Sequence, residues 1–319
     1  MTALAPSPPP PPPKDANRRR SREGVSHAER VIDSSTGWTK GDLVAYYRAI
    51  AHVLIGQLKA RPVSLVRAPQ GIGKPLFFQR HADSLHARGL VELDPSILAG
   101  HPALIALNTA AGIEDLSVLN VVEFHTWNAR IDAIDRPDRL VFDLDPGAGI
   151  AFASMREATE LMIGFLEELN LPSFIKTSGG KGMHVVVPIQ RRYTWDWAHA
   201  FAQAVVARAV RAHPQRFVMK TGPRNRVGKI FIDFLRNTRG ATTVAAYSAR
   251  ARAGLGVSMP IAREELRRLA SGDYWTIKSA PVRLKGLKSD PWEGYSRSAA
   301  RLEDAARELE LPLARQSSS

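Results

Sequence analysis

The 319-residue sequence contains no cysteine, which excludes disulfides, thiol catalysis, cysteine-ligated zinc and iron–sulfur clusters. It also has no long hydrophobic run. Arg48 and Gln57 interrupt the most apolar stretch, residues 44–58, which falls short of the ~18–20 residues of a membrane span. The N-terminal sequence MTALAPSPPPPPPK has no apolar segment behind a basic one and is therefore not a signal peptide. These absences predict a cytoplasmic protein with no membrane partner.

Acidic residues are few relative to basic ones. Forty-four Lys and Arg against 31 Asp and Glu give a formal net charge of +13. Residues 1–25 hold five basic and two acidic side chains, a net of +3, so +10 belongs to the rest of the chain. An excess of this size outside the N-terminal segment favours a polyanionic partner, most often nucleic acid, over a merely soluble basic surface.

Residues 1–25 differ in composition from residues 26–319. Pro6 and Pro8–Pro13 cannot form helix or sheet, and the basic run NRRRSR follows them. We therefore predict a disordered, Pro-rich basic arm over residues 1–25, for which nuclear targeting is an alternative role. Because no internal repeat or linker interrupts the remainder, residues 26–319 are predicted to form one domain.

Helix and strand patterns are mixed along this domain. Apolar residues recur at helical spacing up to Leu58, and Thr39 with Asp42 predicts the N-terminal cap of that helix. Further helices are predicted at residues 152–169, 195–212, 263–270 and 298–309. Strands are predicted at residues 61–68, 118–127, 139–145, 173–177, 184–188, 229–234 and 243–247. Since helices and strands do not alternate strictly, the pattern favours an α+β fold.

The segment Val141–Pro146 carries the first chemical signal. Side chains alternate between the faces of a strand, so Asp143 and Asp145 share one face while Phe142 and Leu144 point into the core. Two carboxylates on one face repel each other unless a cation lies between them, and such ligands suit Mg²⁺ or Mn²⁺. The alternative is that one aspartate caps the next turn and the other is solvated.

A glycine-rich segment, Lys176–His184 (KTSGGKGMH), lies between two predicted strands. Its three glycines allow the backbone to approach a ligand and to present N–H groups to phosphate, with Lys and Ser as further donors. The residue order is not that of a Walker A loop. The alternative is a flexible hairpin-like turn in which His184 is an ordinary half-buried residue.

Asp233 interrupts an apolar strand, where an unpaired carboxylate is costly. A metal ion shared with Asp143 and Asp145 would provide a partner, and an ion pair with Arg236 is the alternative. The potential phosphate-binding groups that follow are Arg236, Arg239, Ser248, Arg250 and Arg252.

Phe77 and Phe78 are adjacent aromatic residues that follow the basic strand residue Arg67. Neighbouring side chains point in different directions, so one ring can lie in the core while the other forms a platform for base stacking. The alternative places both rings in the core.

Taken in order, these motifs resemble the polymerase domain of bacterial DNA ligase D, a member of the archaeo-eukaryotic primase superfamily that serves non-homologous end joining. The resemblance extends from about Ser26 to the C-terminal helix. It rests on residues 61–63, 77–78, 123–128, 142–146, 178–184, 232–242, 247–250 and 257–258. It implies a primase-polymerase fold, with mixed and antiparallel sheets flanked by helices around one catalytic cleft.

The resemblance also implies roles for individual residues. Asp143, Asp145 and Asp233 would be the catalytic triad that binds two Mn²⁺ or Mg²⁺ ions. The nucleotide-binding residues would be Arg67, Phe78, His125, Ser178, Lys181, His184, Arg236 and Arg250. Of these, Arg67 and Phe78 would lie near the base and His125 near the sugar and phosphates. Ser178, His184, Arg236 and Arg250 would hold the triphosphate.

Arg30 and Lys40 stand where the family has two lysines that hold the 5′-phosphate of a broken DNA end. Arginine in place of lysine keeps the charge but alters the geometry. The implied partners are double-stranded DNA ends and gaps with a 5′-phosphate, nucleoside triphosphates, and the end-joining proteins Ku and DNA ligase. The implied location is cytoplasmic and nucleoid-associated.

The expected activity is template-dependent nucleotidyl transfer that extends primer 3′ ends and fills gaps, with a preference for ribonucleotides. One alternative is a phosphotransferase with Asp143 as nucleophile, although residue 147 is Gly where such enzymes have Thr or Val. The other is a non-catalytic DNA-end binding module, for which the basic charge would suffice. The nuclease and ligase domains often fused to the family's polymerase have no room in this chain, and a cysteine-ligated zinc module is not expected.

Overall fold

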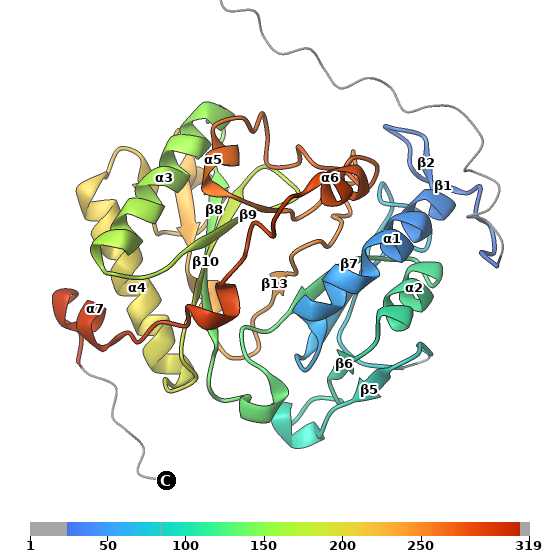
Figure 1. Ribbon diagram of the computed structural model, residues 1–319, viewed down its shortest axis with the longest axis horizontal. Coiled ribbons are helices and arrows are strands. Elements are labelled where there is room, and N and C mark those ends of the chain that lie inside the picture. The colour runs from blue at the N-terminus through green and yellow to red at the C-terminus, as the bar shows by residue number, and fades with distance from the viewer. Residues whose placement is uncertain (1–23, 84, 313–319) are drawn as a thin grey trace, which may run out of the picture.

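Two β-sheets with helices on their outer faces make up the computed structural model, which describes residues 24–83 and 85–312 (Figure 1). The predicted α+β class with mixed and antiparallel sheets is confirmed. All but the last two residues of the predicted arm lie outside the described residues. Within the described part of the chain, no helix combines the length and the apolar character needed to cross a membrane.

The first sheet has the strand order β11-β12-β8-β10-β9-β14, and only its β11–β12 pair is parallel. Its strands are β8 (Arg139–Pro146), β9 (Phe174–Thr177), β10 (Met183–Pro188), β11 (Phe217–Val218), β12 (Ile230–Asp233) and β14 (Pro260–Ile261). Helices α3 (Phe152–Glu168) and α4 (Trp195–Ala212) pack on it. Each helix turns an apolar stripe to the sheet, for example Met162 of α3 and Phe201 of α4, both fully buried.

The second sheet has the order β13-β7-β3-β6-β5, with β4 also paired to β3. Its strands are β3 (Val63–Arg67), β4 (Phe77–Gln79), β5 (Leu90–Glu92), β6 (Ile105–Leu107), β7 (Val121–Thr126) and β13 (Thr243–Val244). Helices α1 (Lys40–Leu58) and α2 (Ala110–Val118) cover it. The predicted cap of α1 is confirmed: Asp42 N–H donates to the Thr39 hydroxyl, and Thr39 N–H donates to the Asp42 carboxylate.

Shorter elements complete the fold. They are the hairpin β1 (Val31–Asp33) and β2 (Trp38–Thr39), α5 (Arg263–Leu266), α6 (Ala280–Gly286), α7 (Glu303–Glu308) and 3₁₀ turns at Pro95–Leu98, Ile131–Ala133, Pro223–Arg226, Leu235–Asn237 and Tyr295–Arg297. The helices predicted at 263–270 and 298–309 are therefore too long. The strand predicted to start at residue 118 starts at Val121, because α2 occupies the residues before it. Helix α2 was not predicted, because Gly112 lies within it and glycine disfavours a helix. A Cβ at this position would lie 2.2 Å from the Arg88 carbonyl oxygen, so packing requires the glycine.

Both sheets contribute to one hydrophobic core. Phe142 of the first sheet and Phe124 of the second belong to the same buried cluster. Tyr46 and Tyr47 of α1 are also buried in it, and their hydroxyls donate to the carbonyls of Tyr247 and Val122. The core therefore fixes how the two sheets face each other, which determines which side chains meet between them.

Candidate functional site

One row of residues across the first sheet carries four titratable side chains. Asp233 on β12 lies opposite Asp143 on β8, Asp143 lies opposite His184 on β10, and His184 lies opposite Lys176 on β9. Residues directly opposite on neighbouring strands place their side chains on the same face. The register therefore brings Asp233 beside Asp143, although 90 residues separate them in the sequence.

The Asp143 carboxylate of this row is poorly compensated. Burial, followed by the negative charges of Asp145 and Asp233, raises the pKa of Asp143 to about 7. Burial also raises the pKa of Asp233. The Oδ1 atom of Asp143 is buried without a hydrogen-bond partner in the described part of the chain. A cation at this position would relieve both the repulsion and the unpaired oxygen.

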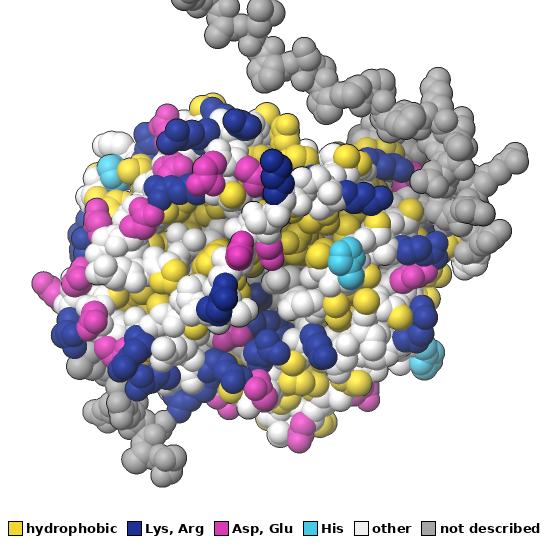
Figure 2. Space-filling view, viewed as in Figure 1, with side chains coloured by type: hydrophobic (Ala, Val, Ile, Leu, Met, Phe, Trp, Pro, Cys, Tyr) yellow, Lys and Arg dark blue, Asp and Glu magenta, His cyan; other side chains and the backbone are white. Residues whose placement is uncertain are grey.

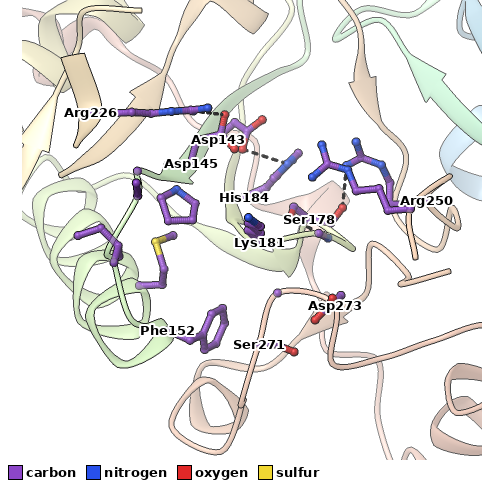
Figure 3. A pocket seen from close by; sticks show the side chains of 18 of the residues that line it. Asp143, Asp145, Phe152, Ser178, Lys181, His184, Arg226, Arg250, Ser271 and Asp273 are labelled. Atoms are coloured by element: carbon purple, nitrogen blue, oxygen red, sulfur yellow. Dashed lines mark hydrogen bonds and ion pairs between the residues drawn. The ribbon is translucent and has the colours of Figure 1, made fainter. Parts of the chain in front are cut away.

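Two arginines contact the other aspartates, and Figure 3 shows the first of these pairs, Arg226 with Asp145. Arg226 Nη1 lies 3.2 Å from Asp145 Oδ2, and Arg236 Nε lies 3.0 Å from Asp233 Oδ2. The ion pair considered as the alternative for Asp233 is thus present. Among the described residues, no three acidic or histidine side chains come close enough together to form a complete metal-ligand set. The donor chemistry suits Mg²⁺ or Mn²⁺, but in this conformation guanidinium groups occupy part of the ligand oxygens.

The glycine-rich segment forms the hairpin loop between β9 and β10. The amides of Gly180 and Gly182 donate to Ser178 Oγ at 3.1 and 3.0 Å. The sequence suggested that the loop presents its N–H groups to a ligand. These two N–H groups are instead satisfied within the loop. Because the Ser178 oxygen accepts both bonds, its own hydrogen is left to donate to another group. A Cβ at Gly182 would lie 2.3 Å from the Leu144 carbonyl oxygen, so this glycine serves close packing against β8.

Lys176 is buried between the two sheets. Its ammonium contacts the Val244 carbonyl at 3.0 Å, Ser258 Oγ at 2.6 Å and His184 Nδ1 at 3.1 Å. Ser258 donates its own hydrogen to the Thr177 carbonyl, so it accepts from Lys176. His184 is 3% exposed, not half-buried, and burial followed by the charges of Lys176 and Arg250 holds its pKa well below the usual range. His184 is accordingly a neutral imidazole.

Glu123 on β7 is a second buried charge. Its Oε2 atom lies 2.6 Å from His125 Nε2 and 3.0 Å from Arg250 Nε, and its Oε1 accepts the Ala251 amide at 2.8 Å. Burial alone would raise the pKa of Glu123, but the hydrogen bond from His125 and the charge of Arg250 lower it to about 2. Arg250 Nη1 also donates to the Ser178 carbonyl at 2.9 Å.

Some of these groups line a cavity of about 820 Å³ (Figure 3), whereas Asp233, Lys176, Glu123 and His125 are not among the residues that line it. Seven of the predicted site residues line it: Asp143, Asp145, Ser178, Lys181, His184, Arg236 and Arg250. Sequence reasoning missed Arg226, Phe152 and Asp273, which also line it. The basic run around Arg226 was a detectable signal, since it directly precedes the strand of Asp233.

The residues predicted near the nucleotide base, Phe78 and Arg67, lie on opposite faces of the second sheet. Strand register puts Phe78, Glu123 and His125 on one face, and the Phe78 and His125 ring centroids are 6.2 Å apart. Arg67 lies on the opposite face, where it donates to Gln79 Oε1 and to the Leu119 carbonyl. The structure therefore does not bring Arg67 to the other predicted residues.

Neither phenylalanine of the adjacent pair lies in the core. Phe77 is 51% exposed and Phe78 is 49% exposed, so both expectations of a core position were wrong. The reason is that β4 pairs with β3 outside the main strand order of the sheet, and no helix in the described part of the chain packs extensively on it. The Arg80 guanidinium lies over the Phe78 ring, 5.8 Å from its centroid.

The structure brings Arg30 and Lys40 together, away from the cavity lining. The Lys40 amide donates to the Arg30 carbonyl at 2.9 Å, and Lys40 Nζ donates to the Ser26 carbonyl at 2.9 Å. Burial, followed by the charge of Arg30, lowers the pKa of Lys40. Arg30 donates to Asn120 Oδ1, while its Nη1 is buried with no partner among the described residues.

Comparison with known proteins identifies relatives of this chain. The model of the LigD primase-polymerase domain family matches residues 39–292. The multifunctional non-homologous end joining protein LigD of Pseudomonas aeruginosa is 48% identical over 284 residues, which are 89% of this chain and 34% of that protein. The LigD of Mycolicibacterium smegmatis is 30% identical over 258 residues, 79% of this chain and 34% of that protein. The chain thus spans about a third of the length of these relatives.

A solved structure is similar over nearly the whole described chain. It is the polymerase domain of Mycobacterium tuberculosis ligase D in complex with DNA, with a TM-score of 0.78 at 26% sequence identity. The match covers 88% of this chain and 100% of that one.

Proposed function

The chain belongs to the family of LigD primase-polymerase domains, and we propose that it is a template-dependent nucleotidyltransferase of non-homologous end joining. In this proposal it extends primer 3′ ends and fills gaps. The observation that carries it is the cavity itself, in which the carboxylates of Asp143 and Asp145 face the same space as Lys181 and Arg250. Nucleotidyl transfer needs both acidic and basic side chains, since the acidic ones bind the metal ions and the basic ones bind the triphosphate.

The three aspartates are the proposed metal ligands. When bound by Asp143, Asp145 and Asp233, two Mg²⁺ or Mn²⁺ ions would activate the primer 3′-hydroxyl and neutralise charge on the leaving pyrophosphate. The raised pKa of Asp143 supports a cation at this place. Arg226 and Arg236 would have to release their aspartates, and Arg236 would then be available to phosphate.

The triphosphate is proposed to bind Ser178, Lys181, His184, Arg236 and Arg250. Ser178 has a hydroxyl hydrogen to donate, because its oxygen already accepts two backbone amides. Arg250 lines the cavity while Glu123 and the Ser178 carbonyl hold two of its nitrogens. Phosphate oxygens accept from such pre-oriented donors with little reorganisation.

A preference for ribonucleotides is part of the proposal. Its support is the family resemblance together with polar groups, His125 and Ser178, that can interact with a sugar hydroxyl. A site that hydrogen-bonds a hydroxyl discriminates against the substrate that lacks it.

DNA ends and gaps with a 5′-phosphate are the proposed nucleic-acid partners. The solved relative is in complex with DNA. Lys and Arg side chains are spread over the face in Figure 2 and are denser low in the view, which supports a general attraction to the DNA backbone. Arg30 and Lys40 are proposed to recognise the 5′-phosphate, and Ku and DNA ligase are proposed to act with the protein at the nucleoid.

Primer extension on a gapped template, with rNTPs or dNTPs and with Mg²⁺ or Mn²⁺, tests the function. We expect metal-dependent single additions that are faster with rNTPs. A non-catalytic end-binding module would bind the same DNA without extending it, which would refute the enzymatic proposal. Equal or faster addition of dNTPs would refute only the sugar preference.

A further inference from the structure

A single carboxylate, that of Glu123, contacts two side chains that are proposed to bind the nucleotide, His125 and Arg250. Glu123 is 5% exposed and lies on the second sheet, on the same face as Phe78 and His125. Its two oxygens receive three contacts, from His125, Arg250 and the Ala251 amide. The proposed functions of His125 and Arg250 do not explain why both converge on one buried acid.

The carboxylate determines which nitrogen of His125 carries hydrogen. Glu123 is ionised at neutral pH and can only accept hydrogen bonds. His125 Nε2, 2.6 Å from its oxygen, must therefore be protonated. Burial lowers the pKa of His125, so the ring is neutral and Nδ1 is left as an acceptor. In the described part of the chain this Nδ1 has no hydrogen-bond partner.

The same carboxylate fixes Arg250 from a second side. Nε donates to Glu123 and Nη1 donates to the Ser178 carbonyl, so the guanidinium plane is held at two points. Arg250 lines the cavity, where its remaining N–H groups are available. Arg250 is thereby a fixed donor, whereas His125 is a fixed acceptor.

We propose that Glu123 is a positioning residue that sets the hydrogen-bond pattern of the nucleotide site. Through it, Arg250 presents donors to phosphate oxygens, which carry no hydrogen, and His125 Nδ1 presents an acceptor to a sugar hydroxyl, which does. This inference rests on the proposed function for the identity of the substrate, but the hydrogen-bond pattern itself belongs to the free protein.

Glu123→Gln is the most direct test, because glutamine keeps the shape of the side chain and removes its charge. If the glutamine C=O faces His125 and Arg250, its NH₂ group faces the Ala251 N–H, and two donors oppose each other there. If the side chain is turned over, its NH₂ group faces the Arg250 N–H, and two donors oppose each other at that position. Either orientation loses at least one of the three hydrogen bonds. Glu114→Gln is the matched control, since Glu114 pairs with Arg48 on the surface, 28% exposed, and does not line the cavity.

Nitrogen-15 NMR of the histidine rings measures the tautomer independently of activity. In the wild-type protein we expect His125 as the Nε2–H tautomer, and in Glu123→Gln a mixture with the Nδ1–H form. We also expect KM for an rNTP to rise about 10- to 100-fold, because the binding groups are no longer held in place, while affinity for DNA changes less than twofold. Glu114→Gln should change none of these quantities.

Three results would overturn the proposal: an Nδ1–H tautomer in the wild-type protein, an unchanged His125 spectrum in folded Glu123→Gln, or an altered spectrum without a change in KM. If Glu123→Gln does not fold, Glu123→Asp replaces it, since the shorter acid keeps the charge but cannot reach all three donors. A wild-type protein that shows the expected tautomer but adds no nucleotide would instead refute the proposed function and leave the hydrogen-bond pattern intact.

Discussion

His184 and Asp143 lie directly opposite each other on neighbouring strands, with His184 Nε2 3.3 Å from Asp143 Oδ1. The contact does not satisfy that oxygen, which has no hydrogen-bond partner among the described residues. On the other side of His184, Lys176 saturates Nδ1. The strand register thus forms a continuous line from the buried amine of Lys176, whose pKa burial holds well below its usual range, through a neutral ring, to an unsatisfied carboxylate. The acidic end of this line is the part of the fold where we expect stability and function to conflict.

Removing Asp143 or Asp145 is expected to abolish nucleotide addition. Asp143→Ala or Asp145→Ala should lower the rate of single addition at least about 100-fold, since charge in the transition state is no longer neutralised. DNA affinity should stay within about twofold, because it depends on dispersed basic contacts. Asp304→Ala, at an 83% exposed surface aspartate, is the control. Extension within tenfold of wild type would contradict the metal-ligand assignment.

Neutralising Asp143 should stabilise the metal-free protein. Its pKa is raised from 3.8 to about 7, so the folded state binds a proton that the unfolded state releases, and stability falls as pH rises between these values. Asp143→Asn should therefore raise the free energy of unfolding at pH 8 by about 2–4 kcal/mol, with little effect at pH 4. Urea denaturation in the presence of a chelator measures both. A variant no more stable than wild type at pH 8 would show that the carboxylate is not strained.

Lys176→Met should destabilise the fold at neutral pH. The substitution leaves the Val244 carbonyl, Ser258 Oγ and His184 Nδ1 without their donor. Each buried unsatisfied group costs about 1–3 kcal/mol, offset in part by relief from burying a charge, so we expect a net loss of about 2–4 kcal/mol. Thermal and urea unfolding provide the measurement, with Lys59→Met at an exposed lysine as the control. No loss of stability would mean that water or rearrangement satisfies all three groups.

Lys40→Ala should erase most of the advantage of a 5′-phosphate. Arg30 and Lys40 are adjacent cations, so the added charge of a terminal phosphate should bind between them. Wild-type protein is expected to bind a gapped duplex more tightly, and to fill it faster, when the downstream strand is 5′-phosphorylated. Arg30→Ala should also weaken the difference. Equal losses on phosphorylated and unphosphorylated gaps, in titrations at fixed salt, would reveal general attraction without a pocket.

Local sequence patterns predicted the strand that carries two of the acids and the start of the first long helix. The alternation around Asp143 and Asp145 predicted their common face, and the capping pair Thr39 and Asp42 predicted the start of α1. Both depend on residues close in the sequence, where steric and hydrogen-bonding rules suffice.

Contacts between distant segments could not be predicted in this way. Nothing near Glu123 in the sequence indicates that Arg250 pairs with it, and nothing near Lys176 indicates that Val244 accepts from it, because both contacts require the two sheets to be docked. The exposure of Phe77 and Phe78 was missed for the same reason: burial depends on which element covers a strand, and no local pattern records that.

The position of Lys176 between the sheets bears on the order of folding. Its acceptors Val244 and Ser258 lie 68 and 82 residues along the chain, so they become available only after long segments have closed. Until then, apposing the two sheets would bury an ammonium group without partners, which is unfavourable. We therefore expect the lysine contacts to form after the main folding barrier, so that they slow unfolding more than they speed folding. The contacts of Lys176 would thus stabilise the packing of the two sheets against each other only after each sheet has formed.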